Sequence, residues 1–271
     1  MKLLVLVFAL MVTPVLAMGP WKEACEGAVP CPLGERSYHI KEPDGWDGVS
    51  PLPLLMHFHG WQRQGTLQGT LIVRHDRISG ATRKRGVLLV APNGLRRSWD
   101  FWKPGSGDVD FARAVLEDVK ARYQVRDKQV FVSGYSWGSN MAWRFVCEDG
   151  NDIAALLAIS GALDQRETCA TAPTEVRQVY GLNDQVLRFP QGPNGEQDHA
   201  VRLRRDKFGC GTGQSFGTWQ QVPFLTLERT VWEDCISGRI SLDIHPGGHF
   251  IPHGWIARQL DELLGLTNSY P

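Results

Sequence analysis

The sequence lacks an excess of charge of either sign, because 29 Lys and Arg side chains are matched by 29 Asp and Glu side chains. A chain that binds nucleic acid or an acidic membrane surface normally concentrates positive charge, so neither partner is expected. Internal repeats are absent too, which argues against a solenoid. No linker rich in Pro, Gly and Ser divides the chain, which favours one domain.

The N-terminal region lacks an apolar run of the length that a membrane-spanning helix needs, which is about 20 residues. Its apolar run extends from Leu3 to Val12 and follows the basic residue Lys2. Val15-Leu16-Ala17 then offers small residues where signal peptidase cleaves. We predict that residues 1–17 are a signal peptide and that the protein is secreted or periplasmic. An uncleaved anchor is the alternative.

The sequence also lacks a CxxC pair or a Cys/His cluster with zinc spacing, so no metal is expected. Its six cysteines all follow the predicted signal peptide. An even number of cysteines in an oxidising compartment favours disulfides. Nearest neighbours in sequence give the predicted pairs Cys25–Cys31, Cys147–Cys169 and Cys210–Cys235.

Apolar stretches that alternate with helical patterns predict an α/β fold, with a mostly parallel central sheet and helices on both faces. The expected strands are 36–41, 54–58, 86–91, 129–132, 153–159, 175–180 and 240–244. We expect a helix over 108–123, started by Asp108, another after Ser136, and a closing helix around Leu260. The segment 189–229 is the least regular and is expected to form an insertion over the site.

The stretch Gly134-Tyr135-Ser136-Trp137-Gly138 stands between an expected strand and an expected helix. A sharp strand-to-helix turn lifts a serine hydroxyl above the sheet edge, and the crowded backbone around it requires glycines. The N–H of the following residue, Trp137, then points at the oxyanion that forms when the serine attacks a carbonyl. The pattern therefore predicts that Ser136 is a nucleophile. A glycine-flanked turn serine without chemistry is the alternative.

A serine nucleophile needs a histidine base and an acid that orients it, in the chain order Ser, acid, His. Asp184 follows the strand that ends at Tyr180, and His249 follows two glycines after the last strand. Both positions lie at the carboxyl ends of strands, where such sheets place their sites. The rival acids are Asp164, Asp198 and Asp206, and the rival histidines are His245 and His253.

The second oxyanion donor is expected in the loop after strand 54–58, where Gly60 permits a close approach. The backbone N–H of Trp61 is the best candidate. His57 and His59, at the end of the same strand, are expected to be structural. Trp99 and Trp102 follow strand 86–91 and are candidates for lining the substrate site; packing beneath a long loop is the alternative.

Together these stretches resemble the secreted α/β-hydrolase esterases that include feruloyl esterases and polyhydroxybutyrate-depolymerase-like proteins. The resemblance covers about residues 34 to 265 and rests on His57-Phe58-His59-Gly60, Val90-Ala91-Pro92-Asn93-Gly94, Asp108-Val109-Asp110-Phe111, Val132 to Gly138, Gly181-Leu182-Asn183-Asp184 and Gly247-Gly248-His249. The sequence departs from the group at Trp137 and Ser139, where smaller or other residues are common.

The resemblance implies a single catalytic domain over residues 18–271, without a cofactor. It also implies hydrolysis of a phenolic, hydroxyalkanoate or sugar ester through Ser136, Asp184 and His249. We expect a monomer without a stable membrane anchor. Two alternatives stay open: a serine peptidase of the same fold, and a non-catalytic protein that binds a carbohydrate or a partner.

Overall fold

The computed structural model describes residues 25–62, 68–164, 166–187 and 199–269. The predicted signal peptide, residues 1–17, and the rival acid Asp198 lie outside these ranges. The described strands are β1 (Cys31–Leu33), β2 (Arg36–Lys41), β3 (Leu52–Phe58), β4 (Leu88–Pro92), β5 (Val125–Tyr135), β6 (Ala155–Ile159), β7 (Glu175–Gly181), β8 (Gln214–Val222), β9 (Leu225–Trp232) and β10 (Arg239–His245).

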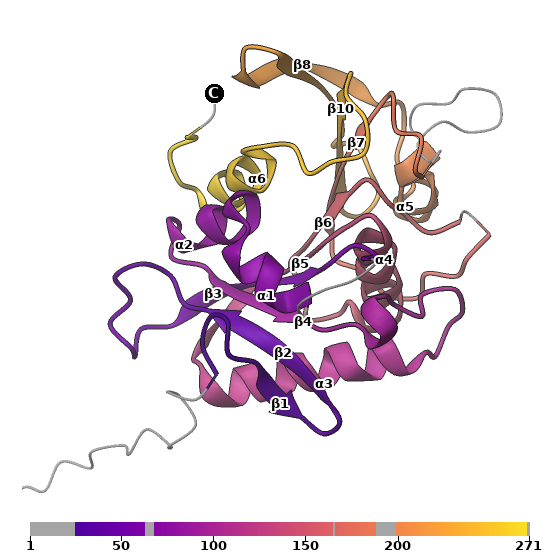
Figure 1. The fold of residues 1–271 in the computed structure, drawn as a ribbon. Helices are drawn as coiled ribbons and strands as arrows, with labels where there is room; N and C mark the ends of the chain where they lie inside the picture. Colours follow the sequence, from indigo (N-terminus) through magenta and orange to yellow (C-terminus); the bar gives the residue numbers. More distant parts are fainter. Residues whose placement is uncertain (1–24, 63–67, 165, 188–198, 270–271) are drawn as a thin grey trace, which may run out of the picture.

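The described strands form one 10-stranded sheet in the order β1-β2-β4-β3-β5-β6-β7-β10-β9-β8 (Figure 1). From β4 to β10 the neighbours pair parallel, whereas both margins of the sheet pair antiparallel. The central strands are buried along nearly their whole apolar length. This pattern is typical of a parallel sheet covered on both faces.

Helices cover both faces of the sheet, as the sequence predicts (Figure 1). Leu54, Met56 and Phe58 of β3 face the core shared with α3 and α4, whereas Leu55 faces the core shared with α1 and α6. The helices are α1 (Gln68–Arg74), α2 (Ala81–Arg83), α3 (Gly107–Arg122), α4 (Trp137–Asp149), α5 (Arg202–Phe208) and α6 (Trp255–Leu264). None of the helices in the described ranges is long and apolar enough to cross a membrane.

Asp108 does not cap α3, contrary to the prediction. The helix begins one residue earlier, at Gly107, and Ser106 occupies the N-cap position. The Asp108 carboxylate is buried, pairs with Arg36 at 2.7 Å and accepts a hydrogen bond from the Asp100 N–H at 2.5 Å. It therefore anchors the loop after β4.

The expectation of an irregular insertion over 189–229 is wrong for most of that segment. Residues 202–208 form α5, and β8 and β9 form a hairpin that extends the sheet beyond β10. In β9 the buried residues Leu225, Leu227 and Val231 alternate with exposed or half-buried ones. The hairpin thus has one face on the core and one in solvent.

A buried carboxylate on β10 holds the hairpin to α6. Asp243 is fully buried and pairs with Arg229 of β9 through two contacts of 2.8 Å. The same carboxylate accepts the indole N–H groups of Trp219 on β8 and Trp255 on α6, at 3.1 and 2.8 Å. Four hydrogen bonds to one carboxylate compensate for its removal from water.

The outermost strand, β8, is irregular. Its register against β9 shifts between Ser215 and Gly217 and again between Gln220 and Val222. Gly217 has a φ of +88°, in the region that favours glycine. Trp219 is buried, whereas most other side chains of β8 are exposed.

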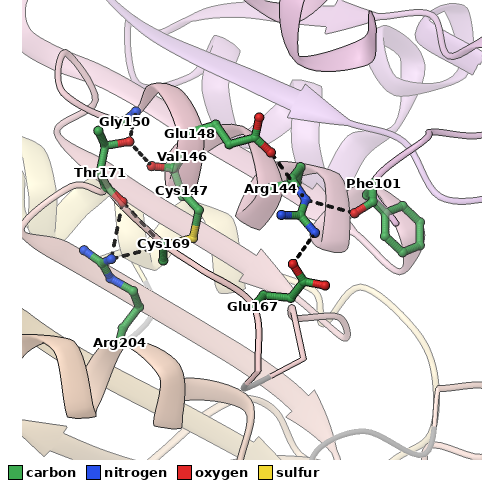
Figure 2. Close-up of a disulfide and its surroundings, with 10 residues drawn as sticks. All are labelled: Phe101, Arg144, Val146, Cys147, Glu148, Gly150, Glu167, Cys169, Thr171 and Arg204. Carbon is green, nitrogen blue, oxygen red and sulfur yellow. Dashed lines mark hydrogen bonds and ion pairs between the residues drawn. A yellow bond between two sulfur atoms is a disulfide. The ribbon is translucent and has the colours of Figure 1, made fainter. Parts of the chain in front are cut away.

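Three disulfides join Cys25 to Cys31, Cys147 to Cys169, and Cys210 to Cys235, which are the nearest-neighbour pairs. Figure 2 shows the second one, which ties α4 to the segment between β6 and β7. It closes a loop with a sequence separation of 22, against 6 for Cys25–Cys31.

Replacing Cys147 and Cys169 together by Ala should therefore lower the free energy of unfolding by about 3 kcal/mol, because a longer closed loop restricts the unfolded chain more. The matched Cys25→Ala/Cys31→Ala variant should lose only about 2 kcal/mol. Urea unfolding of the oxidised proteins measures both. Unchanged stability in the first variant would contradict the prediction.

Candidate active site

Ser136 occupies a strained corner between β5 and α4. Its φ is 57° and its ψ is −126°, a conformation that a residue with a side chain rarely adopts. The surrounding backbone holds it there. The Ser136 N–H donates to the carbonyl of Ile159 at 2.9 Å, and the Ser136 carbonyl accepts from the Ser139 N–H at 2.8 Å, within the first turn of α4.

The two glycines of the motif make this corner possible. A Cβ on Gly134 would lie 2.1 Å from the Gly138 carbonyl oxygen, and a Cβ on Gly138 would lie 2.1 Å from the Phe58 carbonyl oxygen. Both distances are far below van der Waals contact, and backbone rather than a flexible side chain occupies the space. The crowding that the sequence predicts around Ser136 is therefore present.

A continuous chain of hydrogen bonds links Ser136, His249 and Asp184. The Nε2 of His249 lies 2.8 Å from the Ser136 Oγ, and its Nδ1 lies 2.6 Å from Asp184 Oδ2. The geometry fits a neutral ring whose Nδ1–H donates to the carboxylate while Nε2 accepts from the hydroxyl. The second Asp184 oxygen accepts the backbone N–H groups of Val186 and Leu187.

The loops that carry Asp184 and His249 are joined through their backbones. Leu182 N–H donates to the His245 carbonyl at 2.8 Å, and Asn183 N–H donates to the Gly247 carbonyl at 3.0 Å. The Tyr135 hydroxyl, one residue before Ser136, donates to the His249 carbonyl at 2.9 Å. The serine corner thus helps to fix the histidine loop.

Three of the rival residues, Asp164, Asp206 and His245, have other partners. Asp164 pairs with Arg166 on an exposed turn, and Asp206 pairs with arginines on α5. His245 is buried against the Phe250 ring, and its Nδ1 accepts the Gly247 N–H. In the described ranges, no group of three or more His, Cys, Asp or Glu side chains is placed to hold a metal ion.

The loop after β3 approaches Ser136 closely. A Cβ on Gly60 would lie 3.3 Å from the Ser136 Cβ, which brings the following residue, Trp61, to the rim of the site. The Trp61 ring is half exposed and lies 6.0 Å, centroid to centroid, from the Trp137 ring. The candidate oxyanion donors, the N–H groups of Trp61 and Trp137, therefore belong to adjoining segments beside Ser136.

Trp99 does not line the site, contrary to the prediction. It is 3% exposed, donates its indole N–H to the His59 carbonyl at 2.8 Å and packs edge-on against Phe58. Trp102, by contrast, is 63% exposed. Its ring contacts Phe101 and lies 5.7 Å from the Trp137 ring at an interplanar angle of 80°. Trp61, Trp102 and Trp137 form what we call the tryptophan wall beside Ser136.

His59 connects the loops after β3 and β4. Its Nδ1 donates to the Gly60 carbonyl at 2.7 Å, and its Nε2 accepts the Gly94 N–H at 3.0 Å. Burial lowers the pKa of His59 to about 4, and it lowers the pKa values of His57 and His245 to about 3 and about 4. These rings are therefore neutral and structural at neutral pH.

The free energy of unfolding should fall as the pH drops from about 6.5 towards 4. In this window the unfolded chain takes up protons on these histidines and the native protein does not. Replacing His59 by Gln should reduce the slope of the free energy of unfolding against pH by about 1.4 kcal/mol per pH unit near pH 5. Urea unfolding between pH 5 and 8 measures it, and the two proteins should show equal slopes above pH 7. Equal slopes at pH 5 would contradict the prediction.

No protein-family model matches the chain. Over 205 residues it is 28% identical to a probable feruloyl esterase C of Aspergillus niger, covering 68% of this chain and 74% of the fungal one. Over 162 residues it is 29% identical to feruloyl esterase C of Emericella nidulans, covering 59% of each chain.

A solved structure, an acetyl xylan esterase from Aspergillus awamori, matches with a TM-score of 0.62 at 16% identity, covering 86% of this chain and 95% of that one. At this identity the match bears on the fold alone. The chain therefore has the α/β-hydrolase fold and is a distant relative of the feruloyl esterase C group.

Proposed function

We propose that this protein is a serine carboxylic-ester hydrolase in which Ser136 is the nucleophile, His249 the base and Asp184 the orienting acid. The observation that supports this most directly is the hydrogen-bonded chain from the strained Ser136 through His249 to the buried Asp184. The distant relation to feruloyl esterases supports ester chemistry.

In the first half-reaction, the Ser136 Oγ attacks the ester carbonyl while the His249 Nε2 takes the hydroxyl proton. Asp184 stabilises the resulting imidazolium and keeps the ring aligned. The N–H groups of Trp137 and Trp61 hold the oxyanion. When the tetrahedral intermediate collapses, the C–O bond to the alcohol breaks, and the alcohol takes the proton from His249.

In the second half-reaction, a water molecule enters on the side that the alcohol has left. His249 takes one of its protons, and the hydroxide adds to the acyl carbonyl. The bond to Ser136 breaks as its oxygen recovers the proton. The acid is released and the enzyme returns to its starting state. These two steps require no cofactor.

The tryptophan wall is our candidate for binding the part of the substrate next to the scissile carbonyl. Trp61 and Trp102 expose much of their ring surface, and Trp137 follows the nucleophile directly. Indole faces bind flat rings through stacking and edge contacts. We propose phenolic or acetylated-sugar esters as substrates, in keeping with the names of the feruloyl and acetyl xylan esterases to which the chain is similar.

We also propose that the protein acts outside the cytoplasm, in the medium or the periplasm. The three disulfides support an oxidising compartment, because thiols are kept reduced in the cytosol. The predicted signal peptide fits the same proposal.

Hydrolysis of p-nitrophenyl acetate and butyrate tests the assignment. Ser136→Ala and His249→Gln should lower kcat by on the order of 10⁶, and Asp184→Asn by on the order of 10⁴. Asp164→Asn and His253→Gln, the same substitutions at the rival positions, should retain kcat within about twofold, because neither residue belongs to the hydrogen-bonded chain.

Three results would contradict the proposal. Turnover that survives in Ser136→Ala would exclude this serine as the nucleophile. A folded parent protein that cleaves peptide amides better than esters would favour the peptidase alternative, and one that binds esters without turnover would favour a binding protein.

A further inference from the structure

Arg144 is a buried charge in the helix that carries the nucleophile. It lies on α4, eight residues after Ser136, and is 1% exposed. Its Nε donates to the Phe101 carbonyl at 2.9 Å, and its Nη2 pairs with Glu167 at 2.8 Å (Figure 2). One guanidinium therefore joins the nucleophile helix to the loop after β4 and to the loop after β6.

Glu148, one turn further along α4, holds the loop after β4 at a second point. Its Oε2 accepts the Gly105 N–H at 2.9 Å, and its Oε1 lies 3.6 Å from the Nε of Arg144. The helix thus binds the segment Phe101–Gly105 at two points four residues apart, the carbonyl of Phe101 and the N–H of Gly105. We call the pair Arg144 and Glu148 the α4 clamp.

The clamped segment carries Trp102, the most exposed residue of the tryptophan wall. Trp102 follows Phe101, whose carbonyl the clamp binds, and both rings lie within 6.0 Å of the Trp137 ring, centroid to centroid. The Phe101 ring is buried in the core, whereas Lys103, Pro104 and Gly105 are exposed, so beyond Phe101 the segment has little apolar packing of its own. The Phe101 ring therefore anchors one end of the segment, and the position of Trp102 and the residues after it relative to Ser136 depends on the clamp as well.

Glu167, the other partner of Arg144, is itself fixed to α4. Two residues after it, Cys169 forms the disulfide with Cys147, which lies three residues after Arg144 (Figure 2). Residues three apart share one face of a helix. The ion pair and the disulfide are thus two parallel links between α4 and the same loop, and the disulfide keeps the carboxylate next to the guanidinium.

Stability alone does not account for a buried arginine at this position. Desolvation of buried ions offsets much of their attraction, and an apolar group of similar volume often stabilises a fold equally well. A guanidinium, unlike an apolar group, donates hydrogen bonds in fixed directions. At this site those directions select one placement of the Phe101 carbonyl.

We propose that the α4 clamp is a positioning device that determines acyl-group selectivity. It holds Trp102 where the tryptophan wall receives an acyl group that extends beyond the scissile carbonyl. His249 gives its proton to the departing alcohol, so the alcohol part of the ester lies next to His249. The wall includes Trp61 and Trp137, which carry the candidate oxyanion donors, and we therefore assign the wall to the acyl part of the ester. This proposal rests on the proposed esterase function.

The test compares two methyl esters, which share an alcohol and differ in the acid: methyl acetate, too short to reach the wall, and methyl cinnamate, whose planar acyl group reaches it. Glu148→Ala removes the anchor of the Gly105 N–H. It should lower kcat/KM for the cinnamate about tenfold, the scale of one lost aromatic contact, and leave the acetate within about twofold. Its pH–rate profile should match that of the parent.

Two controls separate positioning from a general effect on the helix. Glu148→Gln keeps an acceptor for Gly105 and should restore selectivity. Asp149→Ala removes the neighbouring carboxylate of α4, which pairs with Arg113 at 2.9 Å rather than with the clamped loop, and should leave both substrates unaffected. Arg144→Met should resemble Glu148→Ala, and the latter carries the test if the buried substitution does not fold.

An equal loss for both esters, or unchanged selectivity in Glu148→Ala, would overturn the proposal. Two further measurements separate its failure from that of the esterase function. Amide exchange at Gly105 should be faster in Glu148→Ala whether or not the parent hydrolyses esters. In a Ser136→Ala background, calorimetry should show about tenfold weaker binding of methyl cinnamate when Glu148→Ala is added. Unchanged exchange and unchanged binding would refute the clamp even if the esterase function holds.

Discussion

The close approach of three backbone segments at the end of β5 is the constraint on which the rest of the site depends. Gly134 and Gly138 lie so near to neighbouring carbonyls that no side chain fits, and one of those carbonyls belongs to β3. The sheet therefore fixes the direction in which α4 leaves the corner. Ser136 sits at that corner, and Tyr135 binds the backbone of His249. The proposed nucleophile, the proposed base and the start of the helix are therefore held by the same part of the sheet.

The same helix links this corner to the loops that follow two other strands. The first turn of α4 carries Trp137, and its second half carries Arg144, Cys147 and Glu148, which hold loops from two other strands. A parallel sheet gathers the carboxyl ends of its strands at one edge, but it does not position the loops that follow them. Here that task falls to polar contacts from one helix, with His59 between the loops after β3 and β4.

How well each feature can be predicted from the sequence depends on how far apart in the chain the interacting residues lie. The parallel sheet and the corner at Ser136 follow from local patterns, and the structure brings Asp184 and His249 to that serine, although their roles remain proposals. The alternation of Leu225, Leu227 and Val231 was a signal for β9 that sequence reasoning missed, whereas β8 buries little besides Trp219 and shows no such pattern. Nothing local distinguishes the buried Trp99 from the exposed Trp102, because burial there depends on His59 and Phe58, some 40 residues earlier.

The irregular outer strand has a consequence for the behaviour of the protein in concentrated solution. A free sheet edge offers unpaired N–H and C=O groups to the edge of another molecule, which is a common origin of aggregation. The two register shifts in β8 interrupt that row at short intervals and increase the local twist. A second molecule can therefore match only a few consecutive groups, which disfavours growth of the sheet by the addition of strands from other copies.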